Sequence, residues 1–125
     1  MRFFVFFLIS ALIFQSCKSD EKQILGAWFA SKVTIAGVDK TADYTRNGYK
    51  ESYGESDVYS FSGAPDGKSG EGDYQWTSKT TVKRSGVSNQ TSLEFTVKTL
   101  TNKKMTYTCT INGDEATFEF TKMGK

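Results

Sequence analysis

Two cysteines, Cys17 and Cys109, carry the most reactive side chains of this chain, and their surroundings decide what chemistry each could do. A cysteine becomes a nucleophile when a neighbouring base or positive charge lowers its pKa. The sequence contains no histidine, which removes Cys–His and Ser–His pairs and the commonest zinc ligand. Cys109 lies within a segment of alternating apolar and polar residues, which indicates a buried packing thiol. Covalent chemistry is therefore expected only at Cys17, and it depends on the segment that precedes this residue.

The segment before Cys17 is typical of an export signal. Arg2 is followed by an apolar run from Phe3 to Phe14, and the residues after Cys17 are polar as far as Ile24. As a helix, such a run covers roughly 18 Å, against about 30 Å of hydrocarbon in a bilayer. We therefore predict that residues 1–16 form a signal peptide rather than a membrane-spanning helix.

The residues Phe14-Gln15-Ser16-Cys17 resemble the lipobox of bacterial lipoproteins, which has an apolar residue, a variable residue, a small residue and then cysteine. They differ from the common Leu-Ala-Gly-Cys form in the first two positions. The resemblance implies a mature chain that begins at Cys17, thioether-linked to lipid, with residues 17–23 as a polar tether. Cys109 then has no disulfide partner, so packing alone must stabilise the domain. A secreted protein with a coincidental cysteine is the alternative.

The same resemblance implies a location in the bacterial outer membrane, where two or three acyl chains would anchor the protein firmly. Ser19-Asp20-Glu21 is similar to the acidic signals that direct some Gram-negative lipoproteins to the cell surface. We expect display on the cell surface; a periplasm-facing position and a tether without any signal are the alternatives. The formal net charge of +2 gives no electrostatic case for nucleic acid as a partner.

The residues after the tether are predicted to form one all-β domain, because apolar and polar residues alternate between turn signals. The last hairpin is the clearest case, since Asn112-Gly113 favours a two-residue type I′ turn. Such a turn pairs Tyr107 with Phe118 and Cys109 with Ala116 on one face. The intervening threonines should face outward: Thr106, Thr108 and Thr110.

Shorter alternating segments precede this hairpin, and a change of parity in the first of them predicts a bulge near Ser31. The polar stretch 39–57 is predicted to be a long loop or one short helix, and it contains Tyr44, Tyr49 and Tyr53. Roughly seven or eight antiparallel strands are expected, and they would close into a single up-and-down β-barrel, because closure removes the exposed edges of a sheet.

A family resemblance lies on several of these segments. Leu25-Gly26-Ala27-Trp28 resembles the Gly-x-Trp signature that opens the first strand of lipocalin-like barrels. Later segments are similar to small bacterial lipocalin-like lipoproteins: Val58–Phe61, Gly72–Trp76, Phe95–Thr101 and Thr117–Phe120. The resemblance covers residues 24–122 and implies that Trp28 plugs the closed end of the barrel; an ordinary core tryptophan is the alternative. It also implies that this end lies next to the lipid anchor, with the 39–57 stretch at the opposite, outward rim.

Motifs for catalysis and metal binding are incomplete in this sequence. Gly63 to Ser69 has the outline of a phosphate-binding loop, with one residue too few between its glycines. Ser19 to Lys22 matches a Ser-x-x-Lys pattern but lies in the tether, where no pocket can lower a lysine pKa. We therefore predict no enzymatic activity, no cofactor and no metal site.

Two functions remain compatible with the sequence. In the first, which the lipocalin-like resemblance implies, the barrel binds a small apolar or amphipathic ligand. The candidate lining residues are inward-facing aromatics: Tyr59, Phe61, Tyr74, Trp76, Phe95, Tyr107 and Phe118. In the second, the protein is a non-catalytic accessory lipoprotein that contacts a protein partner in an envelope or surface assembly. Tyr44, Tyr49 and Tyr53 would then form its contact loop, although the same residues would serve equally as a lid.

The candidate lining residues could instead simply fill the core. A barrel of this size is just wide enough for its own side chains or one small ligand, and we expect a mostly filled interior. A cavity larger than about 300 Å³ would favour ligand binding.

Replacing Cys17 by alanine should abolish lipid attachment. Because processing and acylation both act at this residue, Cys17→Ala should remain uncleaved or leave the membrane fraction. Membrane fractionation and the mass of the purified chain measure this, and Cys109→Ala is the control that should keep its anchor. A Cys17→Ala chain that is correctly cleaved and still retained in the membrane would contradict the prediction.

Overall fold

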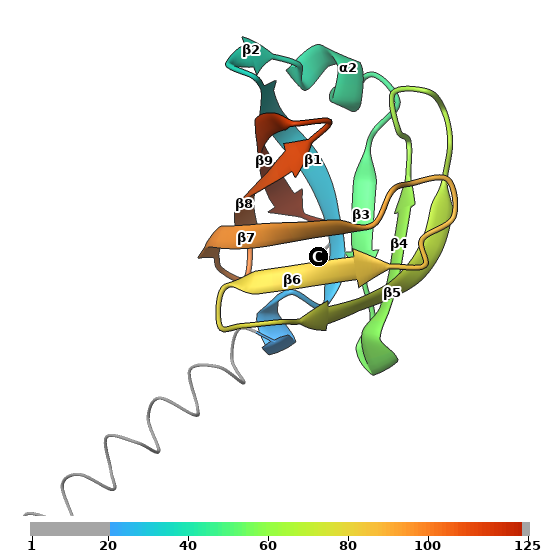
Figure 1. Cartoon of the computed structure of the whole chain (residues 1–125), viewed down its shortest axis with the longest axis vertical. Coiled ribbons are helices and arrows are strands. Elements are labelled where there is room, and N and C mark those ends of the chain that lie inside the picture. The colour runs from blue at the N-terminus through green and yellow to red at the C-terminus, as the bar shows by residue number, and fades with distance from the viewer. Residues whose placement is uncertain (1–20, 124–125) are drawn as a thin grey trace, which may run out of the picture.

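The structure, a computed structural model, describes residues 21–123, so the predicted signal peptide and Cys17 lie outside the described residues. Within this range, eight antiparallel strands close into a barrel through the pairing of β1 with β9 (Figure 1). The strands of the barrel are β1 (Gly26–Ile35), β3 (Lys50–Tyr53), β4 (Val58–Ser62), β5 (Gly70–Trp76), β6 (Thr81–Ser85), β7 (Leu93–Leu100), β8 (Lys104–Ile111) and β9 (Asp114–Lys122). The predicted all-β up-and-down barrel is confirmed.

Short elements lie between the first strands of the barrel. Strand β2 (Val38–Asp39) folds back onto the end of β1, and α2 (Thr41–Thr45) follows it. A 3-10 turn, η1 (Glu55–Asp57), joins β3 to β4. None of the helices in the described part of the chain is long and apolar enough to cross a bilayer.

The alternating strand directions place the connections at two ends of the barrel. One end, called the open end here, contains residues 36–49, 63–69, 86–92 and 112–113. The other end, called the closed end, contains residues 21–25, 54–57, 77–80 and 101–103. Figure 1 shows α2 and the N-terminal segment, drawn in blue, on opposite sides of the molecule.

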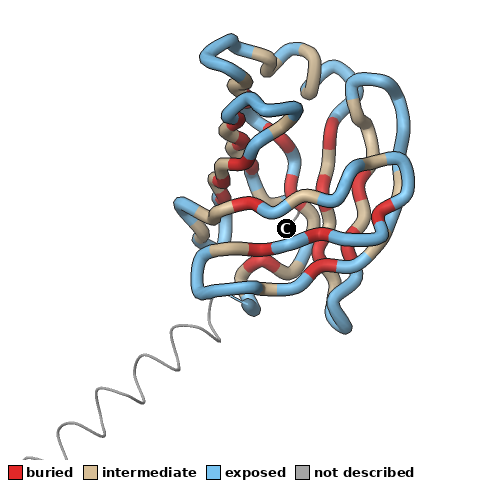
Figure 2. The backbone as a smooth tube through the Cα atoms, viewed as in Figure 1, coloured by how far each residue is buried: buried red, intermediate tan, exposed pale blue. Residues whose placement is uncertain are grey.

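The closing hairpin has the predicted register. Tyr107 lies opposite Phe118, and Cys109 lies opposite Ala116, with all four side chains buried. Asn112 and Gly113 both have positive φ, as a type I′ turn requires. The threonines between the apolar residues of β8 are more exposed than their neighbours, and Figure 2 shows buried positions recurring along the strands in the same way.

The predicted bulge near Ser31 is also present, because the pairing of β1 with β9 shifts between Ala30 and Lys32. The extra residue restores the inward direction after the shift, so Trp28, Ala30 and Val33 are all buried although Val33 has the opposite parity. A single strand thereby supplies side chains to the core along its whole length.

The prediction for residues 39–57 is partly wrong. The short helix exists as α2, but residues 50–53 form strand β3, and Tyr49 and Tyr53 are buried rather than displayed on a loop. Residues 49–53 read Tyr-Lys-Glu-Ser-Tyr, and their buried positions are Tyr49, Glu51 and Tyr53. Because the middle one is charged, the segment does not show the alternation of apolar and polar residues by which a strand is predicted. Residues 40–47 do lie at the open end, whereas 54–57 return to the closed end, where Tyr53 pairs with Gly26.

Trp28 occupies the core next to the N-terminal segment. Its side chain is completely buried, and its indole Nε1 donates a hydrogen bond to the carbonyl oxygen of Ile24 at 2.8 Å. The Nζ atom of Lys122 lies 5.1 Å from the centre of the ring, within the range of a cation–π contact. The predicted burial of Trp28 where β1 enters the barrel is confirmed.

Trp28→Ala should lower the free energy of unfolding by about 3–5 kcal/mol, because it removes a large buried ring and leaves the Ile24 carbonyl without its donor. Phe29→Ala is the matched control: Phe29 is the next residue of β1, faces outward and is 38% exposed. Urea denaturation of both variants, followed by circular dichroism, measures the difference. Equal loss of stability in the two variants would show that Trp28 is not a core plug.

Candidate functional site

A buried ion pair lies inside the barrel. Glu51 from β3 is completely buried, Arg84 from β6 is 2% exposed, and Arg84 Nη1 lies 2.8 Å from Glu51 Oε2. Strands β3 and β6 are separated by β4 and β5 in the sheet, so the contact crosses the interior. Either charge alone would be strongly destabilising here, because burying an unpaired ion costs several kcal/mol.

Three tyrosine hydroxyls donate hydrogen bonds to the Glu51 carboxylate. Tyr49 and Tyr107 donate to Oε2 at 2.6 and 2.7 Å, and Tyr53 donates to Oε1 at 2.7 Å. Together with Arg84 these donors replace the water that the carboxylate loses on burial. Tyr49, Glu51 and Tyr53 occupy alternate positions of one chain segment, so the period of a strand directs all three side chains inward.

The Arg84 guanidinium makes hydrogen bonds through its Nη1 atom and also packs against aromatic rings. Its Nη1 also donates to the hydroxyls of Tyr59 at 2.8 Å and Tyr53 at 3.3 Å. The guanidinium carbon lies 4.4 Å from the centre of the Tyr59 ring and 5.2 Å from that of Phe95. Such cation–π contacts add to the stability of a desolvated arginine.

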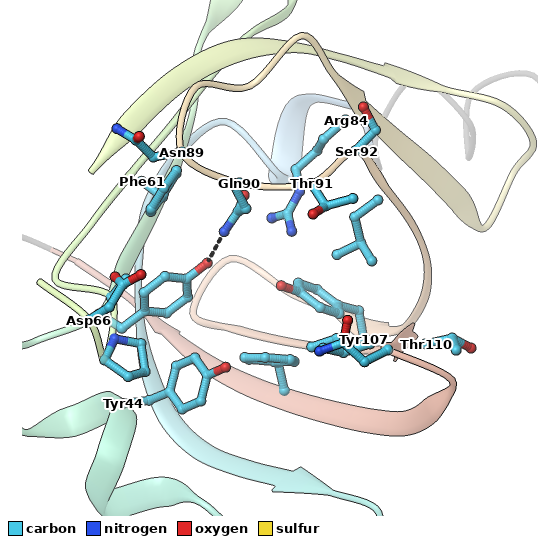
Figure 3. A pocket seen from close by; sticks show the side chains of 17 residues that line it. Tyr44, Phe61, Asp66, Arg84, Asn89, Gln90, Thr91, Ser92, Tyr107 and Thr110 are labelled. Carbon is cyan, nitrogen blue, oxygen red and sulfur yellow. Dashed lines mark hydrogen bonds between the residues drawn. The ribbon is translucent and has the colours of Figure 1, made fainter. Parts of the chain in front are cut away.

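Gln90 connects this network to the open end. The Tyr59 hydroxyl donates to Gln90 Oε1 at 3.2 Å. Gln90 Nε2 donates to the Tyr49 hydroxyl at 3.4 Å, and this bond is the dashed line in Figure 3. Gln90 lies in the 86–92 loop, so one rim loop is tied to the interior through side-chain hydrogen bonds. Both bonds are longer than those around Glu51, which makes this the weakest link of the network.

A cavity of about 410 Å³ lies above the network at the open end. Its apolar wall includes Tyr44, Phe61, Leu93 and Phe118, and Arg84 and Tyr107 contribute polar groups at its base (Figure 3). Rim-loop residues 64–66, 89–92 and 112 and the end of β8, residues 110–111, complete the lining. The interior of the barrel is therefore filled around the ion pair and hollow beyond it.

The structure divides the predicted lining residues into two groups. Phe61, Tyr107 and Phe118 line the cavity, whereas the remaining four do not: Tyr59, Tyr74, Trp76 and Phe95. Tyr59, Tyr74 and Phe95 are buried in the filled part, and Trp76 is only partly buried. Of the predicted rim tyrosines, Tyr44 and Tyr49 line the cavity and Tyr53 belongs to the network below it.

Sequence reasoning missed Glu51, Arg84 and Gln90. A signal was present for two of them, since Glu51 has the parity of Tyr49 and Tyr53, and Arg84 has the parity of the buried Val82. A charged residue at an inward position is normally taken as evidence against a strand. Two such residues of opposite charge in one barrel indicate a buried pair.

The surroundings of the network hold its donors in their protonated forms. Burial, and then the nearby Glu51 carboxylate, raise the pKa values of Tyr49, Tyr53 and Tyr107 well above their ordinary range. Burial by itself would lower the pKa of Arg84, but Glu51 and the surrounding tyrosines raise it well above its ordinary value. Burial also raises the pKa of the Cys109 thiol, to about 12. These groups therefore keep their protons at neutral pH.

The chain matches no protein-family model, and no curated protein matches it. In the described range 21–123, no group of three or more histidine, cysteine or acidic side chains is placed to hold a metal ion. What the described site offers is a hollow with aromatic walls, above a rigid polar base.

Alkaline pH should unfold this protein cooperatively. Below pH about 10 the tyrosines are protonated in both states; above it the unfolded chain loses protons that the folded chain keeps, so the free energy of unfolding falls. All six tyrosines have raised pKa values in the fold, and that of Tyr74 is raised to about 12. Each buried tyrosine that keeps its proton contributes a loss of about 1.4 kcal/mol per pH unit.

The measurement combines far-ultraviolet circular dichroism with the near-ultraviolet absorbance of tyrosinate over an alkaline titration. Tyrosinate absorbance should appear together with the loss of β-structure, above the pH at which free tyrosine ionises. Full tyrosinate absorbance near pH 10 with intact circular dichroism would contradict the buried network.

Proposed function

We propose that this protein is a lipid-anchored binding protein that holds one small, mostly apolar molecule in the cavity at the open end of its barrel. The supporting observation is the cavity itself, whose volume of about 410 Å³ lies within the range of small-molecule sites. Its composition also fits, because such sites combine apolar and aromatic walls with a few placed polar groups.

The filled part of the barrel supports this proposal by keeping the cavity open. A hollow apolar site collapses unless its walls are held by other contacts. Here Tyr49 and Tyr107 belong to both the cavity wall and the hydrogen-bond network, so their ring positions are set by Glu51. Preorganisation of this kind lowers the entropic cost of binding.

We propose binding without catalysis. A general acid or base works best when its pKa lies near the operating pH. Tyr49, Tyr107 and Arg84, at and below the cavity, have raised pKa values that keep them protonated at neutral pH and so do not meet that condition. Of the two carboxylates, Glu51 is already bound by three tyrosine hydroxyls and Arg84, and Asp66 lies on the exposed rim.

The proposed orientation places the cavity away from the membrane. With a lipid on Cys17, the residues up to Ile24 reach at most roughly 25 Å before the barrel begins. Gly26 starts β1 at the closed end, and the cavity lies at the open end beyond Ile35. A protein displayed on the outer membrane in this way would present its cavity to the surrounding medium.

The alternative is an accessory lipoprotein that contacts a protein partner through a tyrosine-rich loop. Its structural basis is weaker, because Tyr49 and Tyr53 are 3% and 1% exposed and their hydroxyls are bonded to Glu51. Tyr44 is half-buried against Tyr49 and Phe118, with ring centres 5.3 Å apart in both cases. Tyrosines in these positions stabilise the rim of the cavity and offer little surface to a partner.

Filling the mouth of the cavity should abolish binding. Thr91 is an exposed residue of the 86–92 loop, and Figure 3 shows its side chain among the lining residues, so Thr91→Trp should occupy the space. The matched control is Thr80→Trp, which places the same side chain on an exposed turn at the closed end. The assay is equilibrium dialysis of N-phenylnaphthylamine, a neutral apolar dye, against the full chain in lipid nanodiscs, with empty nanodiscs subtracted.

The parent and Thr80→Trp should bind about one dye per chain, and Thr91→Trp should bind at least about tenfold more weakly, since tenfold corresponds to about 1.4 kcal/mol. Saturable binding that is equal in all three proteins would place the dye outside the cavity. Absence of saturable binding to the parent would remove the support for a ligand-binding barrel.

A further inference from the structure

Arg84, which lines the cavity, has more hydrogen-bond donors than partners. A guanidinium has five N–H donors. The contacts to Glu51, Tyr53 and Tyr59 all use Nη1. Nε is buried without a partner, and Nη2 has no hydrogen bond to any residue in the range 21–123. Arg84 thus keeps unused donors although it is almost completely buried.

Of the two donor atoms without a partner, Nε is enclosed by protein, whereas Nη2 is not and is the one that can reach the cavity. Arg84 is one of the lining residues, and Figure 3 shows its guanidinium pointing into the ring of side chains, beside Gln90 and Thr91 and across from Tyr107. An unpaired buried donor costs about 1–3 kcal/mol, more for a charged group, so an acceptor placed there would recover that cost. A purely apolar ligand would leave the cost in place.

The charged acceptor of the network, Glu51, is not available to a ligand in the same way. The Glu51 carboxylate is completely buried, does not line the cavity and already accepts hydrogen bonds from Tyr49, Tyr53, Tyr107 and Arg84. A donor group on a ligand could therefore not reach it without breaking one of these bonds. A ligand group that reaches the base of the cavity should therefore be a hydrogen-bond acceptor.

The charge of that acceptor is restricted by Glu51. Its carboxylate already neutralises Arg84 at 2.8 Å, so the pair has no net charge. An anionic ligand group would add a second negative charge beside the first, inside a poorly solvated site, at a desolvation cost that a single arginine cannot offset. An uncharged oxygen, such as a ketone, ester or amide carbonyl, accepts the same hydrogen bond without that penalty.

We infer that the ligand of this cavity carries an uncharged carbonyl-type oxygen that accepts a hydrogen bond from Arg84, while its apolar remainder lies against Tyr44, Phe61, Leu93 and Phe118. This inference rests on the proposed function and adds the chemical class of ligand. It distinguishes the site from an anion-binding site, which an arginine without a carboxylate partner would form.

The test uses four naphthalenes of one shape, substituted at the same ring position. Acetylnaphthalene carries the uncharged acceptor, ethylnaphthalene carries no polar group, naphthoate carries an anionic acceptor, and naphthylmethylamine carries a cationic donor. Each is dialysed to equilibrium against the full chain in lipid nanodiscs, with empty nanodiscs subtracted. The Kd is then referred to the free aqueous concentration.

Acetylnaphthalene should bind about tenfold more tightly than each of the other three, which corresponds to one hydrogen bond to a charged donor. Since ethylnaphthalene is the more hydrophobic of the first two, an apolar pocket without an acceptor requirement would reverse their order. Equal binding of these two, or tighter binding of the ethyl compound, overturns the inference and leaves ligand binding intact. Tightest binding of naphthoate or naphthylmethylamine overturns it as well. Saturable binding of none of the four overturns the proposed function together with the inference.

A variant tests whether Arg84 causes the preference for acetylnaphthalene over ethylnaphthalene. Arg84→Met alone would leave Glu51 buried and unpaired, so the variant is the double substitution Glu51→Gln and Arg84→Met. It removes both charges and every side-chain donor at position 84, while the amide at position 51 can still accept hydrogen bonds from the tyrosines. Circular dichroism confirms its fold, and the preference for acetylnaphthalene over ethylnaphthalene should disappear. A folded double variant that keeps the tenfold preference would assign the acceptor contact to another residue, against the inference. If the double variant does not fold, the four-probe series on the parent still decides.

Discussion

The buried contact between Glu51 and Arg84 is the constraint on which the interior of this barrel depends. A carboxylate with 0% exposure beside a guanidinium with 2% exposure is stable only when other donors replace the water that the carboxylate has lost. The tyrosines meet that demand, since their rings supply apolar bulk to the core while their hydroxyls supply donors to the carboxylate. The polar network is therefore the reason why the middle of the barrel contains tyrosine where phenylalanine would pack equally well.

The same contact divides the interior into two parts with different properties. Toward the closed end, Trp28, Tyr53 and Tyr74 are buried, and the ring centres of Tyr53 and Tyr74 lie 5.1 Å apart. Toward the open end, the network is the base of a cavity, because the short α2 and the loops around it cover the rim without entering the barrel (Figure 1). Within residues 21–123 the only cysteine, Cys109, is free, so packing in the filled half stabilises the described domain, and the hollow half leaves an open volume. The expected filled interior therefore describes only part of the structure, because a cavity remains at the open end.

Prediction from the sequence succeeded where structure is local. The turn at Asn112-Gly113 sets the register of β8 against β9, and a bulge near Ser31 follows from the parity of Trp28 and Val33. It failed for β3, whose inward face is tyrosine, glutamate and tyrosine, because a pattern based on hydrophobicity reads that face as solvent-exposed. The prediction of the lining residues was correct only for some of them for a related reason. Alternation indicates that Tyr59 and Phe95 point inward, but no local pattern indicates how far along the barrel axis they lie.

The sequence by itself determined the fold class, the burial of Trp28, the pairing of the closing hairpin and the absence of histidine chemistry. Each of these depends on residue type, on a period of two, or on a turn of two residues, which are properties of neighbours in the chain. Only the tertiary structure decided that Glu51 meets Arg84, that Gln90 reaches Tyr59, and that a cavity of about 410 Å³ remains above them. The first contact joins β3 to β6 and the second joins β4 to the 86–92 loop, and both exist because closing the barrel brings distant parts of the chain within reach of one another.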